Sequence, residues 1–159
     1  MRVTGAIRKL LDRRREENDI RCSVVVAAAG SSRRMAGVNK LFEDLGGMPV
    51  LARTLRALDA CEKVSEIVVV TREEDIINVY DLCRTFGVRK VTDIVVGGST
   101  RLESVYIGVQ QVSACSGLIA IHDGARPLVT EAVVSAAVDA AAVHTAAAPA
   151  VQVTSTVKR

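Results

Sequence analysis

The chain has 159 residues and a formal net charge of +3; 49% of the residues are hydrophobic, 3% are aromatic, and tryptophan is absent. This composition excludes disorder as the default, and the length is sufficient for one buried core. A core with so few aromatic residues must be built from Val, Ile, Leu and Ala. That choice is typical of parallel strands covered by helices.

Charge, hydropathy and cysteine spacing exclude several kinds of partner and location. Basic residues between positions 8 and 21 are mixed with acidic ones, which predicts a solvated helix face and no nucleic-acid partner. No apolar run reaches about 18 residues, and the N-terminus lacks a secretory signal, so no membrane contact is expected. The four cysteines form no C-x-x-C pair, which predicts reduced, mostly buried thiols and a cytoplasmic protein.

Helices and strands are expected to alternate along the chain. An amphipathic helix is expected at 4–20, so residues 1–21 form an N-terminal helical extension and residues 22–159 a single domain. Buried strands are expected at 22–29, 66–71, 91–96 and 118–122, and a fifth begins at 146–153. Further helices are expected to begin at Pro49, to run over 74–86, to begin at Thr100, and to run from Thr130 to about 143.

Cap residues and apolar spacing predict how these helices end and which faces they bury. Thr100 and Glu103 have the spacing of a capping box, and Gly87 is placed to end the helix at 74–86. The helix that begins at Pro49 is expected to bury Leu51, Leu55 and Leu58. The helix that begins at Thr100 is expected to point Leu102, Val105, Tyr106 and Val109 inward.

Strands that alternate with helices of 10–15 residues indicate βαβ units. The fold class expected is therefore α/β, as a three-layer α/β/α sandwich with a mostly parallel sheet. In such a sheet, ligands bind beyond the carboxyl ends of the strands. Three segments in that position are rich in glycine or charge, and they are expected to carry the chemistry: 30–40, 97–104 and 122–127.

The first of these segments follows the sequence A-A-A-G-S-S-R-R-M and ends at Lys40. Small residues allow the backbone to approach a ligand closely, and its amides can hold phosphate oxygens. Arg33, Arg34 and Lys40 place three cations within eight positions, which suits a triphosphate, although Arg33 and Arg34 could also be ordinary surface charges. Neither G-x-x-x-x-G-K-[ST] nor G-x-G-x-x-G is present, which excludes a P-loop and a dinucleotide fold.

The second segment, G-G-S-T-R-L-E-S-V at 97–105, lies between a strand and a helix. Its backbone amides and short hydroxyls can be presented to a base edge or a phosphate. The alternative is a plain turn that only caps the helix.

The third segment, I-H-D-G-A-R-P at 121–127, follows the end of a strand. Asp123 is placed to hold Mg²⁺, which takes one or two carboxylates together with phosphate oxygens. Arg126 could reach an anionic substrate; alternatively, Asp123 and Arg126 pair within the loop. His122 and His144 are expected to be structural.

Four motifs occur in order along the chain: A-A-A-G-S-S-R-R-M…N-K-L-F, G-G-x-x-R-x-x-S-V, H-D-G-A-R-P and A-P-A-V…T-V-K. Together they resemble the 2-C-methyl-D-erythritol 4-phosphate cytidylyltransferase family, and they span positions 23–158. The first motif recurs across many sugar nucleotidyltransferases, whereas the four together are far more specific. The resemblance implies a Rossmann-like nucleotidyltransferase domain that uses CTP, Mg²⁺ and a polyol phosphate in isoprenoid precursor biosynthesis. Its products are pyrophosphate and 4-diphosphocytidyl-2-C-methyl-D-erythritol.

The resemblance also implies a role for individual positions. Arg34 and Lys40 correspond to two cations that stabilise the transition state. Asp123 resembles the metal-binding aspartate, Arg126 a substrate-side arginine, and Thr156 a residue near the methylerythritol phosphate. The nucleotide-binding residues that it implies are Ala28, Ala29, Gly30, Ser31, Ser32, Arg33, Gly97, Gly98, Ser99, Arg101 and Ser104.

The chain departs from the family pattern at several places. An aspartate is common where Ser99 stands, and the usual D-T before the final lysine is Ser155-Thr156. Family members continue past Arg159 through a dimerisation arm and further acceptor-binding groups. The resemblance therefore implies a domain truncated at its C-terminal end, a weakened homodimer and poor turnover by this chain alone. Two alternatives are ribitol 5-phosphate as the acceptor, and an inactive nucleotide-binding fold.

Overall fold

The computed structural model describes residues 21–30 and 39–152, so the predicted helix at 4–20 lies outside the described part. The strands are β1 (Cys22–Ala27), β2 (Val64–Thr71), β3 (Val91–Val96) and β4 (Leu118–Asp123). The helices are α2 (Val50–Ala60), the 3-10 turn η2 (Glu73–Asp75), α3 (Ile76–Thr85), α4 (Arg101–Gln111) and α5 (Glu131–His144).

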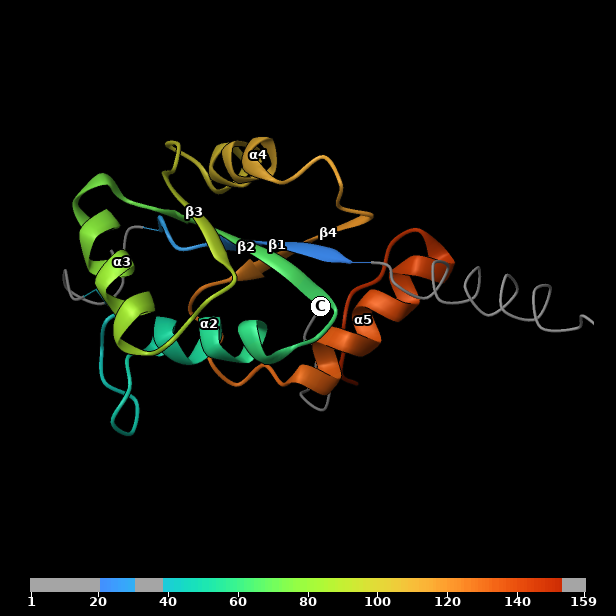
Figure 1. Cartoon of the computed structure of the whole chain (residues 1–159), viewed down its shortest axis with the longest axis horizontal. Coiled ribbons are helices and arrows are strands. Elements are labelled where there is room, and N and C mark those ends of the chain that lie inside the picture. The colour runs from blue at the N-terminus through green and yellow to red at the C-terminus, as the bar shows by residue number, and fades with distance from the viewer. Residues whose placement is uncertain (1–20, 31–38, 153–159) are drawn as a thin grey trace, which may run out of the picture.

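The described strands form one parallel sheet in the order β3-β2-β1-β4. Helix α4 covers one face, and α2, α3 and α5 lie on the other (Figure 1). This arrangement confirms the predicted α/β/α sandwich with a parallel sheet. Because all the strands run in the same direction, the segments that follow them leave the sheet at one edge, where ligands bind in folds of this kind.

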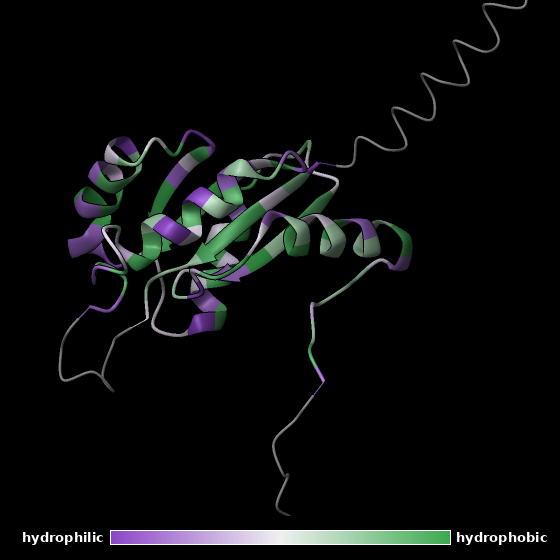
Figure 2. Ribbon diagram, turned by 90° about the horizontal axis from the view of Figure 1, so that it is seen from below, coloured by the Kyte–Doolittle hydropathy of each residue, from purple (hydrophilic) through white to green (hydrophobic). Residues whose placement is uncertain are grey.

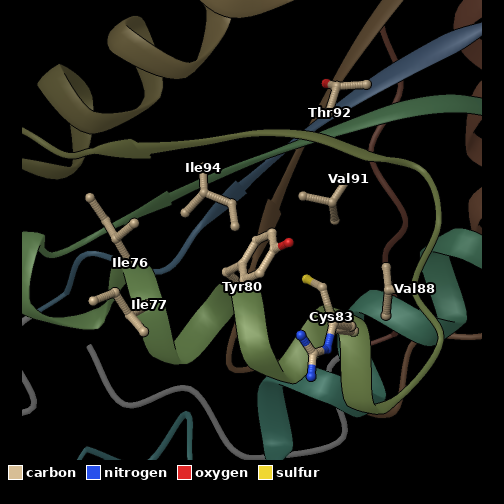
Figure 3. A pocket seen from close by; sticks show the side chains of 9 residues that line it. Ile76, Ile77, Tyr80, Cys83, Val88, Val91, Thr92 and Ile94 are labelled. Carbon is tan, nitrogen blue, oxygen red and sulfur yellow. The ribbon is translucent and has the colours of Figure 1, made fainter.

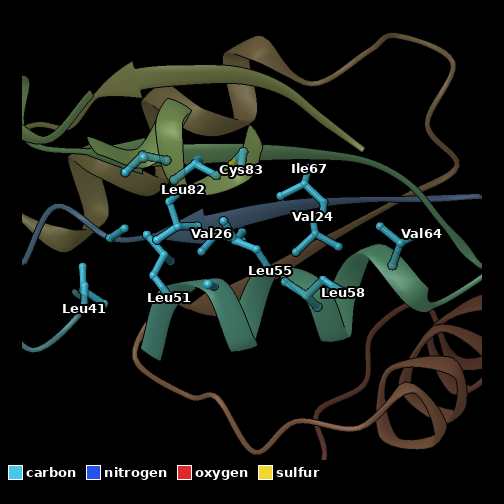
Figure 4. Close-up of a cluster of buried hydrophobic side chains, with 14 of the residues drawn as sticks. Val24, Val26, Leu41, Leu51, Leu55, Leu58, Val64, Ile67, Leu82 and Cys83 are labelled. Atoms are coloured by element: carbon cyan, nitrogen blue, oxygen red, sulfur yellow. The ribbon is translucent and has the colours of Figure 1, made fainter. Parts of the chain in front are cut away.

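The main core lies between β1, β2 and helix α2. Leu51, Leu55 and Leu58 of α2 are at most 1% exposed and belong to the same buried cluster as Val24 and Val26 of β1 (Figure 4). Apolar residues also dominate the central strands in Figure 2. Strands buried on both faces require such runs, and the predicted apolar stripe of α2 is confirmed.

Helix α4 packs on the sheet through small residues, and here the prediction was wrong. Four residues were expected to point inward. Leu102 (79%) and Tyr106 (64%) are exposed, and Val105 and Val109 are half-buried. The buried residues of α4 are Ser104 and Gly108. A Cβ atom on Gly108 would lie 2.4 Å from Cγ1 of Val25. The helix therefore lies too close to the sheet for large side chains on its inner face.

The predicted fifth strand is absent from the described residues 146–152, which take no regular structure. An extended segment becomes a strand only where its backbone pairs with another strand. In the described part of the chain, the outer edge of β4 has no such partner. Ile119 and Ile121 of β4 accordingly remain 45% and 40% exposed.

Other differences from the predictions are confined to the ends of elements. Strand β1 ends at Ala27 rather than at residue 29, and β2 begins earlier, at Val64. Pro49 is the N-cap of α2 rather than its first helical residue. The helix predicted at 74–86 starts as a 3-10 turn, and Gly87 follows it with φ of 66°, as a C-cap glycine does.

All four cysteines lie in the described part and are free; three are buried, and Cys115 is exposed. Burial raises the pKa of Cys22 and of Cys83 to about 11, so these two thiols stay protonated and unreactive at neutral pH. The prediction of mostly buried, unpaired thiols is confirmed. No helix among the described residues is long and apolar enough to cross a membrane.

Candidate nucleotide-binding site

The predicted segments meet at the carboxyl edge of the sheet because hydrogen bonds tie them to the strand ends. The amide of Gly97 donates to the carbonyl of Thr71 in β2 (2.8 Å). The amide of Gly124 donates to the carbonyl of Ala27 in β1 (2.9 Å). Each turn that follows an outer strand is thus bonded to the end of the strand beside it.

The turn after β3 is in direct contact with the residues after β1. A Cβ atom on Gly97 would lie 2.6 Å from Cβ of Ala29 and 2.7 Å from Oγ of Ser104, so only glycine permits this approach. Ser104 is 4% exposed, and its hydroxyl accepts from the amide of Gly98 (3.1 Å) and donates to the carbonyl of Thr100 (2.9 Å). In this geometry Ser104 stabilises the turn between β3 and α4.

Helix α4 begins with the predicted capping box. Oγ1 of Thr100 accepts from the amide of Glu103 (3.1 Å), and the Glu103 carboxylate accepts from the amide of Thr100 (3.3 Å). Ser99 donates to the same carboxylate through its hydroxyl (2.6 Å) and its amide (2.8 Å). The hydrogen bond from the Ser99 hydroxyl is the largest cause that holds the pKa of Glu103 below its usual range. Ser99 is thereby fixed at the start of α4.

Asp123, at the end of β4, bonds to two arginines from different segments. Its Oδ1 accepts from Nη2 (2.8 Å) and Nε (3.3 Å) of Arg101 in α4, and its Oδ2 accepts from Nε of Arg126 (2.9 Å). The hydrogen bond from Arg101 is the main cause that holds the pKa of Asp123 below its usual range. The second and third predicted segments are therefore joined by an ionised carboxylate, and Asp123 does pair with Arg126 within its loop.

The side chains at this edge could bind Mg²⁺ only together with a bound phosphate ligand. Among the described residues there is no group of three His, Cys, Asp or Glu side chains that could hold a metal ion. A single ionised carboxylate such as Asp123 suits an ion that takes its other ligands from phosphates and water. Both carboxylate oxygens carry arginine hydrogen bonds, but Oδ2 accepts only one among the described residues and keeps a lone pair for a metal ion.

The first predicted segment is described only at its two ends. Ala28 is 2% exposed, and the space above Gly30 is open, with nothing within 4 Å of the position of a Cβ atom. Lys40, at the other end, is exposed. The remaining predicted residues of this segment, and the predicted acceptor-side residue, lie outside the described part: Ser31, Ser32, Arg33, Arg34 and Thr156.

The sequence analysis missed a buried carboxylate beside Lys40. Asp75 is 4% exposed and accepts hydrogen bonds from Nδ2 of Asn39 (3.0 Å) and Nε of Arg72 (2.8 Å). Nη2 of Arg72 lies 2.7 Å from the same carboxylate in an ion pair. Arg72 directly follows β2, the one strand whose carboxyl end was given no functional residue. The signal in the sequence was an aspartate four residues after a strand end, preceded by an arginine.

Two grooves border the described part of the sheet. One, of about 920 Å³, runs along β4 and α5, and its lining includes Arg101, Asp123 and Arg126. The other, of about 540 Å³, lies between α3 and β3 and is lined mainly by apolar side chains such as Ile76 and Ile94 (Figure 3). Only the first groove shares residues with the predicted segments.

His122 lies in the lining of the first groove and is half-buried. Its Nδ1 has no hydrogen-bond partner among the described residues. Burial is the main cause that lowers the pKa of His122, so its imidazole is neutral at pH 7 and adds no positive charge to the site.

A parallel sheet whose carboxyl edge carries a glycine turn, an exposed lysine side chain and an arginine–carboxylate cluster is typical of α/β nucleotide-binding folds. The family follows from comparison with known sequences. The chain belongs to the 2-C-methyl-D-erythritol 4-phosphate cytidylyltransferase (IspD) family, whose sequence model matches residues 22–159.

Known relatives agree with this assignment. A 2-C-methyl-D-erythritol 4-phosphate cytidylyltransferase of Halalkalibacterium halodurans is 44% identical over 138 residues, which are 86% of this chain and 60% of that protein. The enzyme of the same name from Pelotomaculum thermopropionicum is 40% identical, over 86% of this chain and 58% of its own length. The crystal structure of 4-diphosphocytidyl-2C-methyl-D-erythritol synthase from Anaerococcus prevotii is similar with a TM-score of 0.68 and 26% identity, over 79% of this chain and 52% of that one. The chain thus spans about 60% of the length of the curated relatives that it matches.

Proposed function

We propose that this chain forms the nucleotide-binding part of a cytidylyltransferase that transfers CMP from CTP to 2-C-methyl-D-erythritol 4-phosphate and releases pyrophosphate. The observation that carries the proposal is the Arg101–Asp123–Arg126 cluster, built from two separate segments at the carboxyl edge of the sheet. Its side chains can hold a metal ion and anionic groups at the place where folds of this class bind nucleotides. The names of the relatives favour methylerythritol phosphate over ribitol 5-phosphate as the acceptor.

The reaction needs charge stabilisation more than covalent help. A phosphate oxygen of the acceptor attacks the α-phosphorus of CTP; a new P–O bond forms, and the bond to pyrophosphate breaks. Negative charge develops on the non-bridging oxygens, where Arg34 and Lys40 are proposed to neutralise it. Mg²⁺, where bound by Asp123 and the phosphates, would supply further charge neutralisation. No nucleophilic side chain is required.

The acceptor phosphate is assigned to Arg126. This side chain is 73% exposed and uses only its Nε in the bond to Asp123. Its remaining N–H groups are therefore directed to no other described residue and can bind a phosphate in a planar, bidentate manner. Asp123 holds the guanidinium in place and stays ionised because its pKa is lowered.

The base site and the remaining partners belong to the same proposal. The turn at Gly97 and Gly98 lies against Ala29 and presents backbone rather than large side chains, which suits a small pyrimidine base. We propose CTP as the nucleotide, a homodimer as the assembly, and the cytoplasm as the location. The exposed Ile119 and Ile121 on the edge of β4 support a homodimer contact at that edge. The free cysteines support the cytoplasm, which is a reducing compartment.

Calorimetric titration with CTP, ATP and GTP in the presence of Mg²⁺ tests the nucleotide assignment. CTP should bind most tightly, and equal affinity for the three would contradict the cytidine assignment. A pyrophosphate-release assay with methylerythritol phosphate and ribitol 5-phosphate identifies the acceptor. Arg126→Ala should weaken acceptor binding, whereas Arg84→Ala, which removes an exposed arginine from the groove beside β3, should not.

A further inference from the structure

A buried ionic cluster lies next to Lys40, outside the groove that Arg101, Asp123 and Arg126 line. Its centre is Asp75, which is 4% exposed and is held by Arg72, the residue after β2, and by Asn39 from the first predicted segment. Burial of a charged carboxylate is costly unless it is paired, and this one accepts two hydrogen bonds and forms an ion pair with Arg72. The cluster joins two segments that are 36 residues apart in the sequence.

The side chain of Asp75 does not cap helix α3, although the residue lies at the N-cap position. It occupies the N-cap of α3, where an aspartate commonly accepts hydrogen bonds from the first amides of the helix. Its side chain makes no such cap bond, and it turns instead to Arg72 and Asn39. The carboxylate therefore links Arg72, after the end of β2, to Asn39, the residue before Lys40.

Asn39 links the Asp75 carboxylate to the backbone around Lys40. Its Nδ2 donates to Asp75, and its Oδ1 accepts from the amide of Leu41 (3.3 Å), so the side chain spans the lysine position. On the other side, Leu41 is 4% exposed, and its carbonyl accepts from the amide of Leu51 (2.9 Å). The backbone of Lys40 is thus held from both sides while its side chain remains exposed.

We propose that Asp75, through Asn39, is a positioning residue that directs Lys40 toward the triphosphate. The inference rests on the proposed function, because the role of Lys40 belongs to that proposal. A positioned lysine binds an anion better than a mobile one, since less side-chain and backbone freedom is lost on binding. Asp75 and Asn39 need not touch the nucleotide themselves.

The sign of the effect of Asp75→Asn separates positioning from plain electrostatics. Loss of a negative charge near the site should, by Coulomb's law alone, favour the anionic CTP. Positioning predicts the opposite: Asp75→Asn weakens the bond with Asn39, frees Lys40, and lowers CTP affinity. Asp81→Asn is the matched control, because it removes an exposed carboxylate from the same helix without touching the cluster. Its CTP affinity should equal that of the unaltered chain or be slightly higher.

The experiment is calorimetric titration of the chain with CTP and with CMP, each with Mg²⁺. Lys40→Ala should reduce CTP affinity about fivefold, as expected for one exposed charged contact, and leave CMP affinity nearly unchanged. Asn39→Ala keeps the Arg72–Asp75 pair and should reduce the CTP affinity by a similar factor, as should Asp75→Asn. In the Asn39→Ala background, Lys40→Ala should have little further effect, because the two residues act through one contact. Thermal unfolding identifies any variant that fails to fold. If Asp75→Asn fails to fold, the CTP affinity of Asn39→Ala tests the positioning role.

The outcomes distinguish this inference from the proposed function. If the unaltered chain does not bind CTP, the proposed function is wrong and the inference is wrong with it. If the chain binds CTP but Lys40→Ala binds it equally well, the inference alone is overturned, because a contact made only in the transition state lowers turnover without lowering affinity. If Lys40→Ala weakens CTP binding but Asn39→Ala binds CTP normally, the inference alone is overturned. Independent, multiplicative losses from Lys40→Ala and Asn39→Ala would overturn it as well.

Discussion

Replacement of Gly108 by alanine tests whether helix α4 depends on its close approach to the sheet. A Cβ atom at this position would lie 2.4 Å from Cγ1 of Val25 and 2.7 Å from Cγ2 of Val70. Both valines are fully buried in the two central strands, and β-branched side chains have few alternative rotamers. The alanine variant can form only if α4 moves away from the sheet or if the valines are displaced.

The two effects of the substitution have opposite signs. Overpacking of a well-packed core costs about 1–3 kcal/mol, whereas alanine in place of glycine stabilises a helix by roughly 1 kcal/mol. We therefore expect Gly108→Ala to lower the free energy of unfolding by about 1 kcal/mol. Gly108→Val should lower it further, because valine is larger and is a poorer helix former. Urea denaturation followed by circular dichroism measures both differences.

A second substitution checks the cause of this loss. Val25→Ala removes the methyl group that the new Cβ atom would meet first, so Gly108→Ala should cost less in that background than in the unaltered chain. A shifted α4 should also weaken CTP binding, since the helix begins at the turn that contains Gly97 and its Ser104 bonds to Gly98 in that turn. A Gly108→Ala variant at least as stable as the unaltered chain would refute the reasoning.

Two further predictions concern the charged residues of the site. Arg34→Ala and Lys40→Ala, made at the matching positions of a full-length relative, should each lower turnover about 10²–10³-fold and change CTP affinity far less. Near-normal turnover in steady-state kinetics would make that residue a surface charge. The pKa of Asp123 is lowered in the folded chain, so its ion pairs stabilise the fold above about pH 4, and this contribution is lost as the pH falls through the lowered pKa. The free energy of unfolding in urea should therefore change less between about pH 6 and about pH 3 for Asp123→Asn than for the unaltered chain. An equal change in the two proteins would contradict this role of Asp123. The pH dependence should persist in part, because the pKa of Glu103 is lowered too.

Local patterns in the sequence were sufficient to predict the strands of the described sheet and the loops that follow them, apart from the fifth strand that was expected at 146–153. Strands β1 and β2 are short valine runs that end at small or polar residues, and their length and β-branched residues favour a strand buried on both faces. The capping box of Thr100 and Glu103 depends on residues three positions apart, so its prediction needed no knowledge of the tertiary fold. Once the strands are parallel, the loops that follow them must gather at one edge, and the main outline of the site follows.

Features that depend on how closely two elements approach could not be predicted in the same way. The apolar residues of α4 indicated the wrong face, because the distance between helix and sheet is set by Gly108, and a glycine has no hydropathy to reveal it. Asp75 was missed for a related reason. An aspartate after a strand usually remains solvated, and its burial becomes evident only when Arg72 and Asn39 are placed around it by the turn after β2 and the loop before α2. Polar residues whose partners lie far away in the sequence are therefore the ones whose function has to be inferred from the structure.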